Sequence, residues 1–284
     1  MTLSNFQREK REWCGEYQLV SIYPRSKNQD NYAKGKRPKT KNISRPAQRN
    51  LNDKNSLKHF KLQANGNFKE GDFLLRLSYS TSNLPKSIEE AKKNISNYIE
   101  RLRYELKKVG RDKELKWMCV TEFEETNKKG KPTRIHHHLL INNVIDRDLL
   151  ESKWSKRVKG KKKPQPIGFT DSKRIQLTED AGLDNLIGYL FKFKKENRTW
   201  SASTNLEKPK QKVVDHKYRR RKMEKLRNSN DLGQEYFEKM YPNHFVKDIK
   251  WSEIKYRDES GKRTIFIGLR CELKLIRKEQ TKRW

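Results

Sequence analysis

Arg134-Ile135-His136-His137-His138-Leu139-Leu140-Ile141 is the stretch of this sequence that points most directly to a fold. Its apolar second half is typical of a buried β-strand, in which successive side chains point to opposite faces of the sheet. In such a strand His136 and His138 share one face, and His137 lies on the other. Two imidazoles side by side at the end of a buried strand can bind a metal ion, whereas isolated histidines are more often structural. The triplet alone leaves both interpretations open.

The chain of 284 residues is long enough for one large domain or two modest ones. Its net charge of +32 arises from 68 Lys and Arg residues against 36 Asp and Glu residues, and only 32% of its residues are hydrophobic. The excess spans the whole chain and predicts a polyanionic partner, of which nucleic acid is the default. A membrane surface is the alternative, but we find no apolar run of about 18 residues, signal peptide or amphipathic anchor. We therefore expect nucleic-acid binding and no membrane partner.

The three cysteines are far apart, odd in number and without a CxxC pair. They predict neither a zinc ribbon nor a disulfide framework, and are typical of reduced cysteines in a cytoplasmic protein. The sequence also has no GxxxxGK[ST] loop. If DNA must be unwound, we therefore expect another protein to supply that activity.

Hydrophobic periodicity predicts an α+β domain in which helices pack on one antiparallel sheet. Ser87–Lys108 has helical spacing, with Ser87 as its N-cap and Gly110 beyond its end. Leu115–Phe123 and Arg134–Asn142 are predicted strands joined by a short polar turn, which favours an antiparallel hairpin. The other predicted elements are a short helix in Asp53–Asn65, a strand in Phe73–Tyr79, a short helix in Asp146–Trp154, a strand in Phe169–Leu177, a helix in Gly182–Lys195 and two strands in Trp251–Ile276.

Composition predicts three parts. We expect a basic, partly disordered N-terminal arm in residues 1–68, the α+β domain in 69–206, and a basic C-terminal extension with a β-hairpin in 207–284. Within the arm, Ser26–Lys41 has almost no apolar residue and is typical of a segment that is disordered or ordered by nucleic acid. Within the domain, Lys156–Lys163 is a basic loop.

The predicted hairpin would bring a carboxylate to the histidine strand. Glu122 has the strand parity of Met118 and Val120 and would point the same way. Two histidines and one carboxylate make a three-ligand site that leaves positions for substrate and suits Mn²⁺, or Mg²⁺ where phosphate oxygens complete the shell. Zn²⁺ is compatible but not required. Glu124 has the same parity and is the alternative ligand, and either acid could instead be a solvated, ion-paired carboxylate.

Tyr189 and Lys192 are three residues apart on a predicted helix and therefore share a face. A tyrosine on a polar face can act as a nucleophile, and a lysine one turn away can favour the phenolate or neutralise charge on a phosphate. A lone tyrosine at the edge of a domain is more often an amphipathic surface residue. The spacing is informative only together with the other motifs.

In combination and in this order, the motifs resemble those of the HUH endonucleases, specifically the rolling-circle replication initiators of phages and Gram-positive plasmids. The resemblance covers about 69–206. It rests on Leu75-Arg76-Leu77-Ser78-Tyr79, the helix with Tyr98, Arg101, Leu102 and Arg103, Val120-Thr121-Glu122-Phe123, His136-His137-His138-Leu139-Leu140, Gly188-Tyr189-Leu190-Phe191-Lys192 and Trp200-Ser201-Ala202-Ser203-Thr204-Asn205-Leu206. The chain departs from the family at His137, where a bulky hydrophobic residue is usual, and at Arg76-Leu77-Ser78, where threonines are frequent.

The resemblance implies a single-tyrosine reaction on single-stranded DNA at a replication origin. Tyr189 would form a 5′-phosphotyrosine and free a 3′-hydroxyl, so that the strand can be rejoined or extended by host DNA polymerase with a host helicase. It implies that His136, His138 and Glu122 bind a divalent metal, Mn²⁺ or Mg²⁺, and that Lys192 steadies charge. We expect DNA contacts from Arg101, Arg103, Lys194, Arg198, Arg219, Arg220 and Arg221.

Two other functions remain open at this point. A single-tyrosine mobilisation relaxase or transposase shares the chemistry, but the order of motifs, with the tyrosine after the histidines, favours the replication initiator. A basic nucleic-acid-binding protein without catalysis, whose histidine triplet is only structural, is the alternative from another class. Intact DNA affinity without metal binding would support that alternative.

Overall fold

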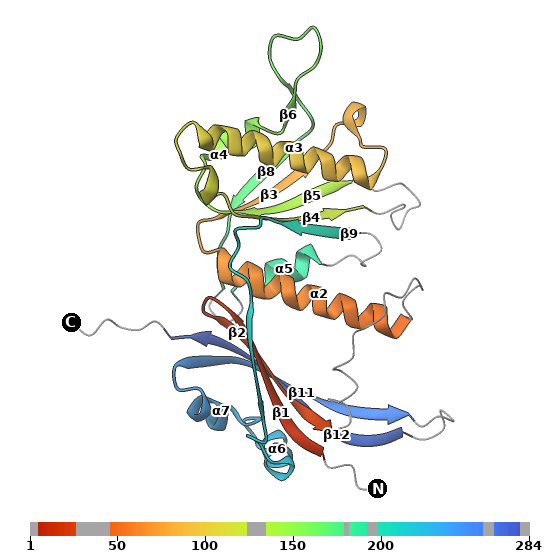
Figure 1. The fold of residues 1–284 in the computed structure, drawn as a ribbon, viewed down its shortest axis with the longest axis vertical. Helices are drawn as coiled ribbons and strands as arrows, with labels where there is room; N and C mark the ends of the chain where they lie inside the picture. Colours follow the sequence, from red (N-terminus) through yellow and green to blue (C-terminus); the bar gives the residue numbers. More distant parts are fainter. Residues whose placement is uncertain are drawn as a thin grey trace, which may run out of the picture. The chain divides into compact units, whose positions relative to one another are not determined.

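The predicted histidine strand is β5 (His136–Ile141), the central strand of a five-stranded antiparallel sheet (Figure 1). It pairs with β4 (Trp117–Glu122) on one side, as the predicted hairpin requires, and with β3 (Phe73–Ser78) on the other. The outer strands are β8 (Thr170–Arg174) beside β3 and β9 (Arg198–Ala202) beside β4.

This sheet belongs to a unit formed by Asn67–Glu207, and a second unit contains Met1–Gly66 together with Lys208–Trp284. The computed structural model describes residues 5–26, 46–123, 135–178, 182–191, 198–257 and 264–278. Within these ranges, no helix combines the length and the apolar character needed to cross a membrane.

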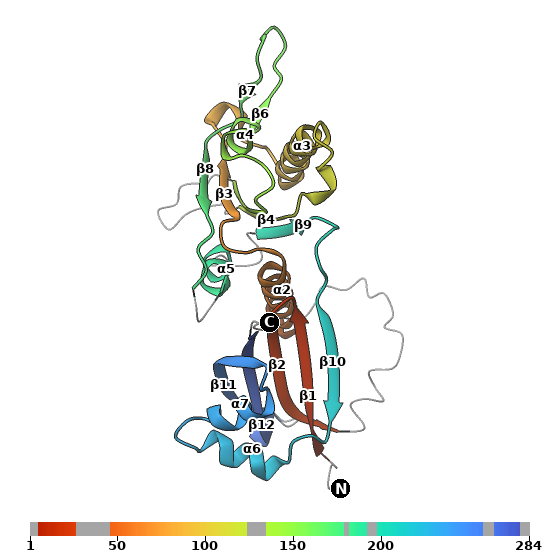
Figure 2. The ribbon, with the colours of Figure 1, turned by 90° about the vertical axis from the view of Figure 1, so that its left-hand side faces the viewer.

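Helices cover both faces of the sheet in the Asn67–Glu207 unit (Figures 1 and 2). α3 (Ile88–Lys107) and α4 (Arg147–Ser152) lie on one side, and α5 (Asp184–Leu190) lies on the other. Ser87 caps α3 as predicted, by accepting a hydrogen bond from the backbone N–H of Glu90 at 3.2 Å, and Gly110 follows with a φ of 72°. The fold is therefore the predicted α+β class.

The core between α3 and the sheet determines which strand residues face which helix. The buried side of α3 packs against every second residue of the strands, a set that contains Leu75, Leu77, Cys119, Leu139 and Ile141. The intervening residues point to the face that α5 covers. This alternation separates His137 from its two neighbours.

A short two-stranded ribbon, β6 (Ser155–Lys156) with β7 (Gln165–Pro166), carries the predicted basic loop. In both ribbon views the loop projects beyond α3 and away from the sheet (Figures 1 and 2). Gly168 returns the chain to β8, and a Cβ atom there would lie 1.9 Å from the carbonyl oxygen of Ser78. Only glycine allows this close approach of two backbones.

The second unit contains another five-stranded antiparallel sheet, in the order β10-β1-β2-β12-β11. Two helices on it contribute Met223, Leu226 and Phe237 to a core shared with Val20 and Leu273. Its strands are β1 (Asn5–Cys14), β2 (Tyr17–Ser26), β10 (Lys210–Asp215), β11 (His244–Arg257) and β12 (Thr264–Arg277), and its helices are α2 (Pro46–Asn67), which ends one residue inside the other unit, α6 (Arg220–Arg227) and α7 (Gln234–Met240).

The division at residues 1–68 and 207–284 into an arm and an extension differs from this arrangement. β1 and β2 pair with β10 and β12, so the two ends of the described chain build one sheet. Two predicted helices also have other bounds, because α2 begins at Pro46 and α5 ends at Leu190. Apart from Ser26, the segment predicted to be disordered lies outside the described residues, as does most of the predicted helix beyond Leu190.

Candidate metal centre

Glu122, His136 and His138 lie together on the α5 face of the sheet. The register of β4 and β5 places Glu122 opposite His136 and Val120 opposite His138, and cross-strand partners share a face. Nε2 of His136 is 3.0 Å from Oε2 of Glu122, and Nε2 of His138 is 3.9 Å from the same oxygen. One donor atom from each residue lies within 4.8 Å of the others, so the cluster could hold a metal ion.

The donor set fits a divalent ion. Two imidazole nitrogens and one carboxylate oxygen suit first-row metals, and three protein ligands leave positions for substrate oxygens. The side chains of Glu122 and His138 are each 5% exposed. Burial lowers the pKa of His138 to about 4, against an opposing effect of Glu122 and with smaller lowering by His136 and Arg76. His138 is therefore neutral near pH 7, the form in which an imidazole binds a metal.

His137 points to the opposite face and is fully buried beneath α3. Its Nε2 lies 2.8 Å from the hydroxyl of Tyr79, and its Nδ1 lies 2.8 Å from the hydroxyl of Thr121. Burial, with smaller effects of His136 and His138, lowers the pKa of His137 to about 3. A neutral imidazole has one donor and one acceptor nitrogen, so one hydroxyl accepts from it and the other donates to it. The middle histidine is thus held away from the cluster by two hydrogen bonds.

Tyr189 lies beside the cluster. Its ring centroid is 5.8 Å from that of His138, and the ring planes are 79° apart. Ile187 and Leu190 are buried, whereas Tyr189 is 59% exposed, so α5 presents the tyrosine at an accessible edge of the site. The predicted apolar stripe of this helix was partly wrong, because Ile187 is fully buried and Leu186 only half-buried. Lys192 and the alternative ligand Glu124 lie outside the described residues.

Arg76 is a residue at this site that the sequence analysis did not select. It pairs with His138 across β3 and β5, so both side chains point to the α5 face, and Arg76 is exposed. Its positive charge is close enough to contribute to the lowered pKa of His138. The signal was present in the sequence, since a single arginine between Leu75 and Leu77 has the parity opposite to the two core leucines. A cation here lies beside the candidate metal ligands.

The residues predicted to contact DNA do not form one group. Arg101 donates from Nε to the carbonyl oxygen of Lys153 at 3.0 Å, and Arg103 pairs with Glu100 at 2.8 Å. Lys194 lies outside the described residues, and only the backbone of Arg198 is described, at the start of β9. The remaining three belong to the other unit, at the start of α6, and they are Arg219, Arg220, which pairs with Glu224, and Arg221.

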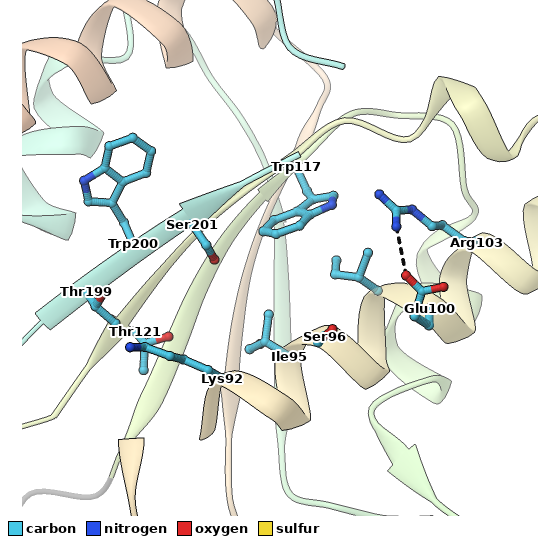
Figure 3. Close-up of a pocket in the computed structure, with 11 residues that line it drawn as sticks. Lys92, Ile95, Ser96, Glu100, Arg103, Trp117, Thr121, Thr199, Trp200 and Ser201 are labelled. Atoms are coloured by element: carbon cyan, nitrogen blue, oxygen red, sulfur yellow. Dashed lines mark hydrogen bonds and ion pairs between the residues drawn. The ribbon is translucent and has the colours of Figure 1, made fainter. Parts of the chain in front are cut away.

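The ion pair of Arg103 borders a cavity of about 290 Å³ between α3 and strands β4 and β9 (Figure 3). Trp117 lies on the α3 side of β4, whereas the ring of Trp200 points to the other side of β9 (Figure 3). The register agrees, because Trp200 pairs with Val120 and thus lies on the same face as Glu122. Trp200 is therefore a second residue of the metal face that lies outside the predicted site residues.

Comparison with known families gives one match. A family of replication-associated proteins, described by its ORF2 member, matches residues 72–197, a span that contains Glu122, His136, His138 and Tyr189. No curated protein and no solved structure matches the chain significantly. The unit that carries the candidate metal centre is therefore similar to replication-associated proteins.

Proposed function

We propose that this protein initiates DNA replication by nicking and rejoining single-stranded DNA through a covalent link to Tyr189. The observation that carries the proposal is the position of an accessible tyrosine beside a cluster of two histidines and a glutamate. The similarity of the same residues to a replication-associated family supports it. A divalent ion, Mn²⁺ or Mg²⁺, would be held by Glu122, His136 and His138 and would polarise the scissile phosphate.

The reaction would be a transesterification. The hydroxyl oxygen of Tyr189 attacks the phosphorus atom, the bond from phosphorus to the 3′ oxygen breaks, and the phenolic proton is lost as the 3′ oxygen gains one. One phosphodiester replaces another, so the step is reversible and the strand can be rejoined. Arg76, exposed beside His138, would stabilise negative charge on a non-bridging oxygen. Lys192, which follows Tyr189 closely in the sequence, would add a second positive charge.

The product of nicking would connect the site to replication. The free 3′-hydroxyl is a primer for a DNA polymerase of the host. Unwinding would come from a separate helicase, since the sequence contains no GxxxxGK[ST] loop. The net charge of +32 would hold the DNA backbone.

The test is the formation of a covalent adduct. Single-stranded oligonucleotides tiled across the gene and its flanks are incubated with protein and Mn²⁺, and adducts are detected on denaturing gels and mapped by peptide mass spectrometry. We expect an adduct on Tyr189 that EDTA and Tyr189→Phe abolish. Tyr104→Phe is the matched control, because Tyr104 is similarly exposed and carries the same phenol. An adduct on another residue would contradict the proposal, and no adduct with no metal binding would leave a non-catalytic nucleic-acid-binding protein.

A further inference from the structure

A second surface of the Asn67–Glu207 unit has the properties of a nucleic-acid site. A groove of about 1160 Å³ lies between α3, α4 and the β6–β7 ribbon, and it continues to the start of β8. Since α3 and α4 cover the face of the sheet opposite to α5, this groove lies on the other side of the sheet from the candidate metal centre. It is therefore not part of the site described above.

The ribbon gives the groove a positive charge that the neighbouring acids do not neutralise. Six of the eight residues in 156–163 are Lys or Arg, all of them are exposed, and within the described residues none of these cations forms an ion pair. The three acids that line the groove each have a cation of their own. They pair as Glu100 with Arg103, Glu105 with Lys108 and Lys153, and Glu151 with Arg147.

Two exposed aromatic rings border the same groove. Phe169 is 77% exposed and Tyr104 is 64% exposed, and both line it. The close approach of Gly168 to the backbone of Ser78 fixes the chain next to Phe169, so this ring is presented by a tightly constrained backbone. Exposure of a phenylalanine to this degree has no role in packing, and accessible rings are the surfaces on which unpaired bases stack.

Arg101 adds a donor to the wall of the groove. Its Nε donates to the backbone of Lys153, while its Nη2 is buried and has no hydrogen-bond partner among the described residues. A buried donor without a partner costs free energy, which an acceptor on a ligand would offset. A phosphate oxygen is an acceptor that a guanidinium group binds well.

We propose that this groove binds single-stranded DNA, with the ribbon cations on the phosphates and bases stacked on Phe169 and Tyr104. The combination of rings and cations favours a single strand over a duplex, whose bases are already paired and stacked. It also favours nucleic acid over an acidic protein segment, which has no need of exposed rings. The groove would hold a part of the strand that is separate from the phosphate at Tyr189, and the binding needs neither the metal nor the nucleophile.

The test is DNA binding in EDTA by the full chain carrying Tyr189→Phe, so that failure of the nicking reaction does not affect the result. The ribbon variant combines Lys159→Gln, Lys161→Gln and Lys162→Gln, and fluorescence anisotropy is measured with a labelled single strand and with its duplex. The matched control combines Lys86→Gln, Lys93→Gln and Lys113→Gln. It removes the same charge from exposed lysines of the same unit that do not line the groove.

We expect the ribbon variant to bind the single strand about 10- to 100-fold more weakly than the control at roughly 0.1 M salt. The estimate follows from a salt slope of about −0.7 per phosphate on single strands, which makes each contact worth up to about fivefold. The slope itself should fall by about 2. Phe169→Ala should weaken the single strand at least about fivefold and leave the duplex unchanged, and Phe169→Tyr should restore binding.

Crosslinking locates the contact. An oligonucleotide carrying 5-iodouracil should crosslink on irradiation to the peptides that contain Phe169 or Tyr104. Equal affinities of the ribbon variant and its control would overturn the proposal and leave an acidic protein segment as the candidate occupant. A loss confined to the duplex, with no effect of Phe169→Ala, would also overturn it, because the ribbon would then contact paired DNA.

Discussion

Replacement of His137 by leucine tests whether the middle histidine is a structural anchor and not a metal ligand. His137 is fully buried, and its two hydrogen bonds join Tyr79, directly after β3, to Thr121 in β4, both of which are also buried. In His137→Leu the Thr121 hydroxyl loses this partner, and the Tyr79 hydroxyl keeps only the amide of Asn94, at 3.4 Å. The strand that carries the candidate ligands would then lose its polar anchors on the opposite face.

The magnitude follows from these contacts. Each buried polar group left without its partner costs about 1–3 kcal/mol, so the two together cost about 2–6 kcal/mol. Burial of a leucine in place of an imidazole offsets about 1–2 kcal/mol of this loss. We therefore expect His137→Leu to lower the free energy of unfolding by about 2–4 kcal/mol. The triple variant Tyr79→Phe, Thr121→Val and His137→Leu should regain most of that stability, because replacing all partners by apolar groups is close to neutral.

The assay is urea unfolding followed by circular dichroism, with hydrogen exchange of the β5 peptide as a readout specific to this unit. The triple variant should also bind Mn²⁺ with unchanged affinity by calorimetry, since Glu122, His136 and His138 are intact. A loss below about 0.5 kcal/mol in the single variant, or a triple variant as unstable as the single one, would refute the anchoring role. Loss of Mn²⁺ binding in a stable triple variant would refute the assignment of His137 to the opposite face.

Three further predictions concern the metal ligand, the cation at the site and the other unit. Glu122→Gln should weaken Mn²⁺ binding by calorimetry at least about 100-fold, whereas Glu124→Gln should change it less than about threefold; the reverse order would make Glu124 the ligand. Arg76→Gln should slow adduct formation by about 10- to 1000-fold while Mn²⁺ affinity stays within about threefold, and an unchanged rate would exclude a role in charge stabilisation. Glu9 is buried in the second unit; burial raises its pKa, but hydrogen bonds from Tyr241, Lys217, Arg11 and Tyr218 outweigh this and lower it. Because the folded pKa lies below the unfolded one, Glu9 contributes stability above the ordinary carboxyl pKa, and this is lost as the pH falls through the folded value; thermal melting between about pH 6 and pH 3 should show that decline, and Glu9→Gln should flatten it.

The elements around the candidate site were predictable because their signals are local. Ser87 and Gly110 mark the ends of α3 within one stretch of sequence, and alternation within six residues separates His137 from His136 and His138. The pairing of Glu122 with His136 follows from two adjacent strands joined by one connection. Each of these inferences needs only residues that are close in sequence.

The strands of the second unit were missed because their stabilising partners are distant. β1 contains Gln7-Arg8-Glu9-Lys10-Arg11-Glu12, which has no apolar residue and therefore indicates a solvated arm. In the structure Glu9 is fully buried and bonds to Tyr218 and Tyr241, which lie 209 and 232 positions away. A charged residue in a sheet interior is tolerated only with such partners, and a single sequence does not reveal them.

The discontinuous second unit has a consequence for synthesis on the ribosome. β1 and β2 emerge first, yet β2 needs β12 and β1 needs β10, and these strands are translated only after the whole Asn67–Glu207 unit. The nascent hairpin therefore waits with two unpaired edges, which its dense charge protects against intermolecular pairing. The unit with the candidate metal centre can fold while the hairpin waits, since none of its described strands pairs outside Asn67–Glu207. Premature termination after residue 207 would thus leave that unit complete but attached to a hairpin whose two edges stay open.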